Sequence, residues 1–200
     1  KGKTVGGIAP LGTFSFFGNK ILTTGEGGMV TCHDKTVLDK INVYKNHGNN
    51  PGKRYHHQVI GYNYRMTNLQ AAIGLAQVER ANEILEKKTS IAKLYKEGLK
   101  DLPLKIQPHM TWAEPVNWMN CIVLEERELS RDQVQNELAK LGIDTRPFFQ
   151  PIPHLDIYDD PGVFPVSHKL SSMGINLPSS SKLLEDEVQY IVSSIRKIFS

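Results

Sequence analysis

The stretch FSFFGNKILTTGEGGMV, residues 14–30, constrains the fold of this chain more than any other segment. Two strand-like apolar runs, Phe14–Phe17 and Met29–Thr31, flank a lysine and a glycine-rich turn, which predicts a β-hairpin. Most lysines beside a turn are solvated surface groups. Here the aromatic run would place Lys20 at the edge of a core, and the glycines let the backbone approach a ligand closely. The hairpin therefore predicts a lysine that faces a ligand.

A lysine in such a place can act on a carbonyl group. A partly desolvated amine is a nucleophile that forms a Schiff base with an aldehyde or ketone. Pyridoxal 5′-phosphate is the commonest cofactor of this kind, because its aldehyde binds the lysine and its ring accepts electrons. Ser15 precedes Lys20 on the same hairpin and has a hydroxyl that could bind the phosphate. The alternative for Ser15 is a strand hydroxyl that bonds to backbone.

Composition excludes several other classes of function. With 24 basic and 21 acidic residues in 200, the net charge is only +3, and no basic block suggests a nucleic-acid partner. Only two cysteines occur, Cys32 and Cys121, without paired metal spacing, so we expect a reducing compartment and no zinc module. No run is long and apolar enough to predict a membrane span, and no signal-peptide pattern is visible. We expect a cytoplasmic protein.

The first half of the chain, residues 1–101, is predicted to be the C-terminal part of a larger domain. Asp34 caps a helix that runs to Tyr44, and residues 45–64 form a long loop rich in Gly, Asn and His. Thr67 and Gln70 form a capping-box pattern that opens a helix continuing with a bend to about Leu99.

Residues 102–200 are predicted to form a small α+β domain. The expected elements are strands at 104–107, 119–124 and 144–149, a helix between Ser130 and Gly142, a loop after residue 149, and an amphipathic terminal helix. Trp112 and Trp118 are expected in its core or rim, although stacking on a nucleobase is an alternative.

Four segments carry a resemblance to a known family. FSFFGNKILTTGEGGMV resembles the cofactor-lysine segment of the DegT/DnrJ/EryC1/StrS nucleotide-sugar aminotransferases, and IGYNYRMTNLQAAIGLAQVE, residues 60–79, resembles their second signature. DTRPFFQPIPH and GINLPSS are similar to their C-terminal segments, in the same order. Gly18-Asn19 and the Arg146–Phe149 run look most like the perosamine-synthase branch.

The resemblance implies a type I pyridoxal-phosphate fold of the aspartate aminotransferase kind. In it Lys20 would be the Schiff-base lysine and proton carrier, and Ser15 would bind the phosphate. The loop before the long helix reaches the neighbouring subunit's site in this family, so Asn63 or Arg65 would help to hold that phosphate in a homodimer. Without the resemblance, Asn63 reads as a loop residue tolerant of left-handed backbone and Arg65 as a surface salt bridge.

Two further residues are candidates for contact with the substrate. His154 lies between Pro153 and Leu155 in a loop, where the alternative is a histidine bonded to backbone. Glu26 is a candidate to face the sugar, but a carboxylate in a glycine-rich turn is more often solvated. His56 and His57 are adjacent, point differently and have no further ligand at metal spacing, so no metal site is expected.

The predicted function is transfer of an amino group, from glutamate, to a nucleotide-linked 4-keto-6-deoxy sugar, as in the biosynthesis of polysaccharides or secondary metabolites. A related dehydratase is disfavoured, since relatives of that kind replace the lysine by histidine. The alternatives from another class are a non-catalytic or regulatory member of the fold and an inert C-terminal fragment. The resemblance also implies that the carboxylate partner of the pyridine nitrogen lies upstream of these residues, so this chain alone would be incomplete.

Overall fold

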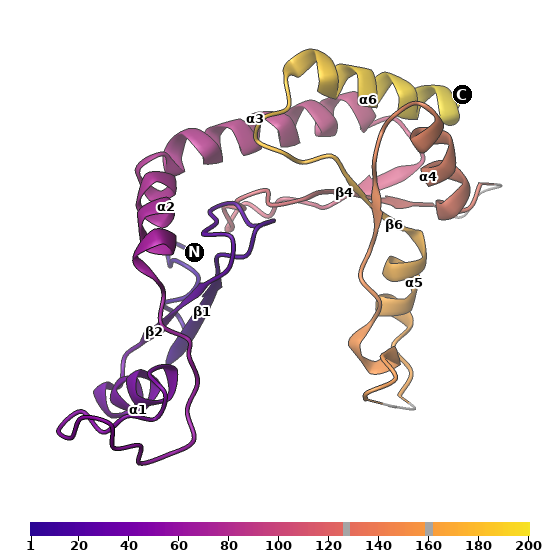
Figure 1. The fold of residues 1–200 in the computed structure, drawn as a ribbon. Coiled ribbons are helices and arrows are strands. Elements are labelled where there is room, and N and C mark those ends of the chain that lie inside the picture. Colours follow the sequence, from indigo (N-terminus) through magenta and orange to yellow (C-terminus); the bar gives the residue numbers. More distant parts are fainter. Residues whose placement is uncertain (126–128, 159–161) are drawn as a thin grey trace. The chain divides into compact units, whose positions relative to one another are not determined.

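The computed structural model describes residues 1–125, 129–158 and 162–200. Contacts between Cα atoms divide the chain into two compact units, Lys1–Asn82 and Glu83–Ser200, which are described separately below. The boundary lies at the start of the long helix α3, Ala81–Leu99, so nearly all of that helix belongs to the second unit (Figure 1). The predicted division at residues 101 and 102 remains a prediction.

The first unit consists of a hairpin and two helices. Its elements are β1 (Leu11–Ser15), β2 (Gly28–Cys32), α1 (Lys35–Lys45) and α2 (Asn68–Glu79). β1 and β2 pair antiparallel with Thr13 opposite Val30, which confirms the hairpin. Strand β1 begins and ends earlier than the aromatic run predicts, because Phe16 and Phe17 belong to the connecting loop.

The caps of the first unit follow the sequence closely. The Asp34 carboxylate accepts hydrogen bonds from the backbone N–H groups of Thr36 and Val37, at 2.7 and 3.2 Å. The capping box of Thr67 and Gln70 is complete at the start of α2. The predicted long helix is interrupted at Arg80, which separates α2 from α3.

The first unit buries little. Among residues 1–82, all of which the structure describes, no apolar side chain is buried, and Thr24 is the one buried polar residue. The hairpin is thus more exposed than its aromatic run suggests, with Phe17 47% exposed. A two-stranded sheet without a second layer over it leaves its apolar side chains in contact with water.

The second unit holds a layer of helices on an antiparallel sheet. Its strands are β3 (Leu104–Ile106), β4 (Asn120–Leu124), β5 (Arg146–Pro147) and β6 (Gly174–Leu177), in the spatial order β3-β4-β6-β5. Its helices, besides α3, are α4 (Arg131–Lys140), the 3₁₀ turn η1 (Ile152–His154), α5 (Pro165–Met173) and α6 (Glu185–Ile198). Helix α4 begins with the predicted capping box of Ser130 and Gln133.

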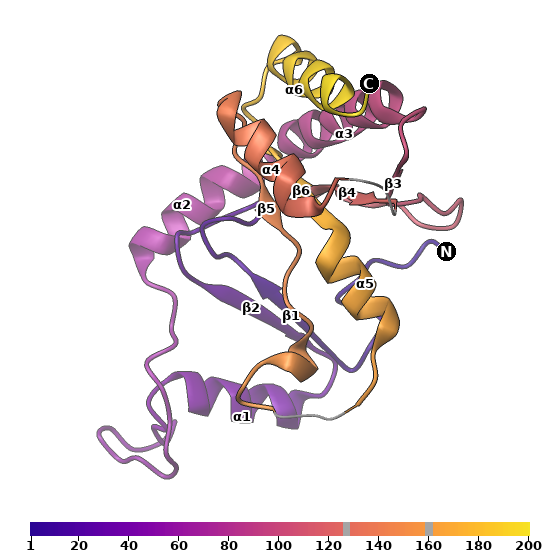
Figure 2. The ribbon, with the colours of Figure 1, turned by 90° about the vertical axis from the view of Figure 1, so that its right-hand side faces the viewer.

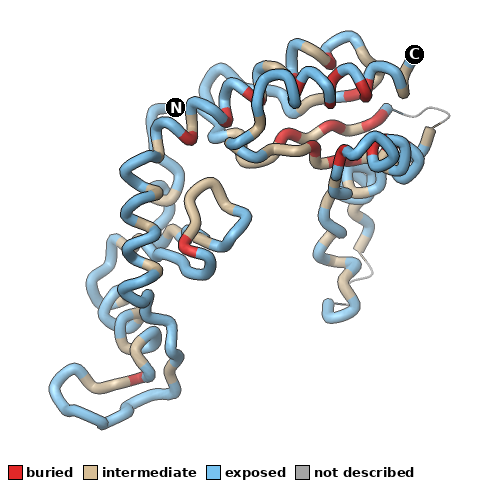
Figure 3. The backbone as a smooth tube through the Cα atoms, turned by 45° about the horizontal axis from the view of Figure 1, so that its top comes forward, coloured by how far each residue is buried: buried red, intermediate tan, exposed pale blue. Residues whose placement is uncertain are grey.

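The core of the molecule lies in this second unit, where the buried residues gather (Figure 3). Helices α3 and α6 lie side by side in both ribbon views (Figures 1 and 2). A Cβ on Gly98 would lie 2.6 Å from Cγ1 of Val192, so the absence of a side chain at Gly98 permits this close packing. The fully buried side chains are Leu99, Ile122, Val134, Leu138, Ile175, Val188 and Ile195.

Two parts of the second unit differ from the sequence prediction. The strand expected at 144–149 is limited to Arg146–Pro147, although the Phe148 N–H still donates to the Gly174 carbonyl of β6 at 3.1 Å. Helix α5 and strand β6 were not predicted from the apolar pattern. None of the helices within the described ranges has the length and apolarity that a membrane span requires.

Candidate active site

The loop that joins β1 to β2 is fixed by bonds to one residue, Phe16. Its N–H donates to the Gly27 carbonyl, and its own carbonyl accepts from the Thr24 N–H, both at 2.9 Å. The Thr23 hydroxyl donates to the same carbonyl of Phe16 at 3.0 Å. Farther along the loop, the Lys20 N–H donates to the Phe17 carbonyl at 2.9 Å, which forms a turn. The lysine therefore stands on an ordered loop.

The glycine-rich turn is packed against helix α2. The buried Thr24 hydroxyl donates to the Glu26 carbonyl at 2.6 Å, and the Gln70 side-chain amide of α2 donates to the same oxygen at 3.0 Å. Gly27 has φ 143°, and a Cβ there would lie 2.6 Å from the Thr24 hydroxyl oxygen. The glycine is thus required both by its backbone conformation and by the close approach.

Ser15 is the last residue of β1, and Lys20 lies in the loop that follows it. The Ser15 hydroxyl oxygen accepts from the Phe17 N–H at 3.3 Å, so its O–H remains available to donate to another group. Ser15 is exposed and Lys20 is half-buried. An amine and a hydroxyl donor held on one ordered loop fit the aldehyde and the phosphate of pyridoxal 5′-phosphate.

Asn63 and Arg65 lie in a different segment of the same unit, just before α2. Backbone bonds from the Tyr62 and Tyr64 N–H groups to the carbonyls of Tyr44 and Lys45, at 2.7 and 3.0 Å, fix this segment to the end of α1. Asn63 and Arg65 are exposed. Asn63 does not have the left-handed backbone conformation on which its alternative role as a loop residue depends. Their roles remain predictions.

The two candidate substrate contacts lie in different units. The Glu26 side chain is exposed in the glycine-rich turn of the first unit. His154 belongs to the second unit, in the 3₁₀ turn, and its ring lies 4.0 Å from that of His168 on α5, centroid to centroid. Sequence reasoning missed the contact with His168, because no local pattern joins the 3₁₀ turn to that helix. Within the described ranges, no three His, Cys, Asp or Glu side chains gather as metal ligands would.

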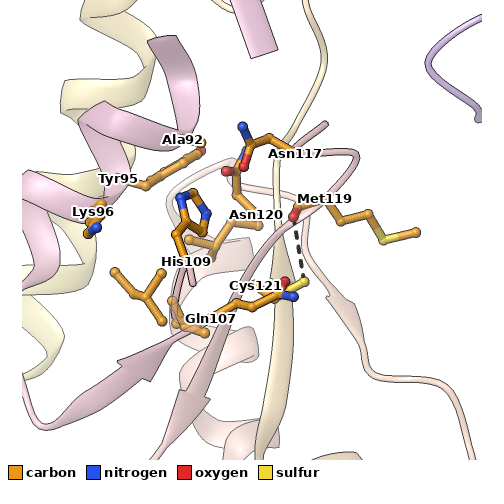
Figure 4. A pocket seen from close by; sticks show the side chains of 12 residues that line it. Ala92, Tyr95, Lys96, Gln107, His109, Asn117, Met119, Asn120 and Cys121 are labelled. Carbon is orange, nitrogen blue, oxygen red and sulfur yellow. Dashed lines mark hydrogen bonds between the residues drawn. The ribbon is translucent and has the colours of Figure 1, made fainter. Parts of the chain in front are cut away.

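A pocket in the second unit contains none of the predicted site residues. Helix α3, strands β3, β4 and β6 and the loop between β3 and β4 line it, with polar side chains that include Lys96, His109, Asn117 and Asn120 (Figure 4). The Cys121 thiol at its wall donates to the side-chain oxygen of Asn176 at 3.1 Å. Burial raises the pKa of this thiol, which disfavours a role as a nucleophile.

The comparison with family models assigns the class of protein. Residues 1–196 match the model of the DegT/DnrJ/EryC1/StrS aminotransferase family, and the chain belongs to this family. Its fold is accordingly that of the type I pyridoxal-phosphate-dependent transferases, as the sequence predicted.

Individual relatives refine this likeness. The chain is 41% identical to a GDP-perosamine synthase of Vibrio cholerae and 42% identical to one of Escherichia coli O157:H7, over 203 residues in each case. Each match covers 100% of this chain and 55% of the relative, so the chain spans about half the length of these proteins. The predicted similarity to the perosamine-synthase branch is confirmed.

Solved structures agree on the fold. Helicobacter pylori PseC, an aminotransferase involved in the biosynthesis of pseudoaminic acid, has 27% identity and a TM-score of 0.89, covering 100% of this chain and 56% of that one. A DegT DnrJ EryC1 StrS aminotransferase from Brucella abortus has 27% identity and a TM-score of 0.86, covering 96% of this chain and 51% of that one.

Proposed function

We propose that the protein carrying this chain is a pyridoxal-phosphate-dependent aminotransferase. It moves an amino group from glutamate to the keto carbon of a nucleotide-linked 4-keto-6-deoxy sugar. The observation that carries this proposal is the ordered loop with Ser15 and Lys20, in a chain that matches an aminotransferase family over nearly all its length. The similarity to GDP-perosamine synthases favours a GDP-linked sugar.

The cofactor supplies an aldehyde for exchange of amines and a ring that accepts electrons from the substrate carbon. A Streptococcus pneumoniae protein described as a sugar aminotransferase, Spr1654, was solved in its PLP-form and has a TM-score of 0.90 with this chain at 27% identity. In our proposal Lys20 holds the aldehyde, and its Nζ carries the proton to and from the substrate carbon. The Ser15 hydroxyl donates to the phosphate.

We further propose that the active protein is a cytoplasmic homodimer. Asn63 and Arg65 stand on an exposed segment, where they are free to reach the phosphate held by a partner subunit. Glu26 and His154 are proposed to contact the sugar substrate. No metal ion takes part in the proposed reaction.

The test is a two-step assay of the protein loaded with cofactor. Glutamate alone should change the cofactor absorbance, and later addition of a GDP-linked 4-keto-6-deoxy sugar should restore it and yield the amino sugar. A Lys20→Ala variant should fail both steps, whereas Lys35→Gln, an exposed change on α1, should pass both. If wild-type protein binds the cofactor but shows neither step, it is a non-catalytic member of the fold.

A further inference from the structure

The side chain of Gln70 forms hydrogen bonds to two different parts of the first unit. Its amide oxygen accepts from the Thr67 N–H at 2.9 Å and from the Thr67 hydroxyl at 3.1 Å, at the start of α2. Its amide nitrogen donates to the Glu26 carbonyl at 3.0 Å, 44 residues earlier in the chain. A capping box uses only the amide oxygen, so helix capping does not account for the second bond.

The Glu26 carbonyl is a point at which the glycine-rich turn is held. The buried Thr24 hydroxyl donates to the same oxygen at 2.6 Å. Thr24 also packs on α2, since a Cβ on Gly74 would lie 3.0 Å from the Thr24 methyl carbon. Gln70 and Gly74 are one helical turn apart and lie on the same face of α2. The turn is therefore held against this helix by a hydrogen bond and by close packing.

Backbone hydrogen bonds connect the glycine-rich turn to the residues that are proposed to bind the cofactor. The Thr24 N–H donates to the Phe16 carbonyl, and the Phe16 N–H donates to the Gly27 carbonyl, both at 2.9 Å. Phe16 directly follows Ser15 and is four residues before Lys20. A displacement of the turn would therefore move Phe16, and with it the loop on which the hydroxyl and the amine stand.

We infer that Gln70 is a positioning residue of the cofactor site, which acts through the Glu26 carbonyl on the loop that holds Ser15 and Lys20. This inference rests on the proposed function and adds to it a residue that needs no contact with cofactor or substrate. Catalysis by a bound amine depends on its exact place, because a displacement of about 1 Å can reduce a rate about a hundredfold. A hydrogen bond that fixes the loop on α2 limits such displacement.

The substitution Gln70→Glu separates the two roles of this side chain. Glutamate is as suitable as glutamine in a capping box, because its carboxylate accepts from the Thr67 N–H in the same way. It has no N–H with which to donate to the Glu26 carbonyl, and its second oxygen would face that carbonyl oxygen. The variant should therefore keep α2 capped while the glycine-rich turn loses one of its supports.

The first measurement is amide hydrogen exchange in the whole protein that carries this chain, loaded with cofactor. In Gln70→Glu, the peptide with residues 16–27 should exchange about tenfold faster than in wild type, since loss of one hydrogen bond corresponds to roughly that factor. The melting temperature should stay within about 2 °C of the wild-type value, because the helix cap is retained.

The second measurement is the rate of the glutamate step. In Gln70→Glu, kcat for this step should fall about tenfold, while KM for glutamate should stay within about twofold of wild type, because the change affects the place of the reacting amine. Unchanged exchange in Gln70→Glu would overturn the inference. Faster exchange with an unchanged kcat would overturn it too, because the turn would then have no effect on the reaction.

Two control variants distinguish positioning from helix stability. Thr67→Ala removes the cap hydroxyl of α2 and leaves the Gln70 amide able to donate, so it should lower the melting temperature with little effect on kcat. Gln133→Glu makes the same substitution in the capping box of α4 and should change neither exchange in the hairpin nor kcat. Equal loss of kcat in Thr67→Ala and Gln70→Glu would refute the positioning role in favour of a general loss of stability.

The exchange measurement also separates this inference from the proposed function. It needs no substrate, and it is repeated without cofactor. A wild-type protein that fails the two-step assay refutes the proposed function. Equal exchange of the hairpin in wild type and in Gln70→Glu refutes the role of Gln70, whatever the outcome of that assay.

Discussion

The ammonium group of Lys88 lies 2.5 Å from the carbonyl oxygen of Ser179, and equally close to that of Trp118. Lys88 is on α3 and only 5% exposed. Burial lowers its pKa, since a low-dielectric environment disfavours the charged form. Through these two hydrogen bonds the Lys88 side chain holds the segments around Trp118 and Ser179 against α3.

Removal of the Lys88 ammonium should destabilise the second unit. Lys88→Met keeps an apolar stem but leaves two carbonyl groups without their donor, which should cost about 2 kcal/mol in the free energy of unfolding. Urea unfolding measures the loss. Lys87→Met is the control, because Lys87 is exposed and pairs only with Glu83, one turn away, so the change should cost less than about 0.5 kcal/mol. Equal effects of the two substitutions would show that the buried bonds contribute nothing.

Tyr95 should make the protein sensitive to alkaline pH. Burial raises the pKa of its phenol well above the ordinary value of 10.0, and the hydroxyl donates to the Pro178 carbonyl at 2.9 Å. The folded state therefore keeps a proton that the unfolded state releases, so the stabilisation is complete below pH 10 and declines as the pH rises further. Tyr95→Phe should flatten this decline in melting temperature between about pH 9 and 11.

Lys88 is present in the wild type and in the Tyr95→Phe variant, so its titration affects the two pH profiles equally. At neutral pH, Tyr95→Phe should lower the free energy of unfolding by about 1 kcal/mol, for the lost hydrogen bond. Parallel pH profiles for the two proteins would contradict the assignment to Tyr95.

Lys20 should be the residue that reacts with the cofactor aldehyde. Borohydride reduction of the loaded protein, followed by peptide mapping, should place the pyridoxyl mass on the peptide that contains Lys20. Lys3 and Lys35 are both exposed and serve as internal controls in the same digest. A label on either of them, with none on Lys20, would refute the assignment.

Asn63 should serve the site of the partner subunit. Lys20→Ala and Asn63→Ala chains should each be inactive as homodimers, with activity reduced at least about a hundredfold. Their mixed dimer should have one site with both lesions and one with neither, so mixing should restore activity. A mixture of Lys20→Ala chains with Ser15→Ala chains is the control. Ser15 and Lys20 are proposed to serve the site of their own chain, so neither chain can complete the other's site.

In that second mixture each mixed dimer carries one lesion in each site, so activity should not return. Subunit exchange must be shown by differently tagged chains. Exchange without recovery in the Lys20→Ala and Asn63→Ala mixture would place Asn63 in its own subunit's site.

Residues 1–82 should be cut by protease well before residues 83–200 when the 200-residue chain is studied alone. The first unit buries no apolar side chain, while the second has a continuous core. Segments with little buried surface open at low cost in free energy.

The 200-residue chain alone should also be a poor catalyst, because the resemblance implies that the carboxylate for the pyridine nitrogen lies upstream. Equal activity of the chain and of a protein extended upstream by roughly one domain, on the order of 150 residues, would refute this.

Local signals in the sequence were sufficient wherever the structure depends on neighbouring residues. The Asp34 cap and the capping boxes at Thr67 and Ser130 are confirmed, because each joins residues within one helical turn. The strand around Pro147 was predicted too long, since its extent depends on which N–H groups can pair with β6. Helix α5 was not predicted, although Val166 and Leu170, both exposed in the structure, lie one helical turn apart.

The hairpin with Ser15 and Lys20, the helix caps and, through four motifs in order, the family all follow from local patterns of residues. The burial of Lys88 depends instead on tertiary packing, because its acceptors lie 30 and 91 residues away along the chain. Tertiary packing likewise leaves the aromatic hairpin exposed and forms the core in the second unit. Burial depends on which distant segments pack over a residue, and no local pattern of residues specifies that.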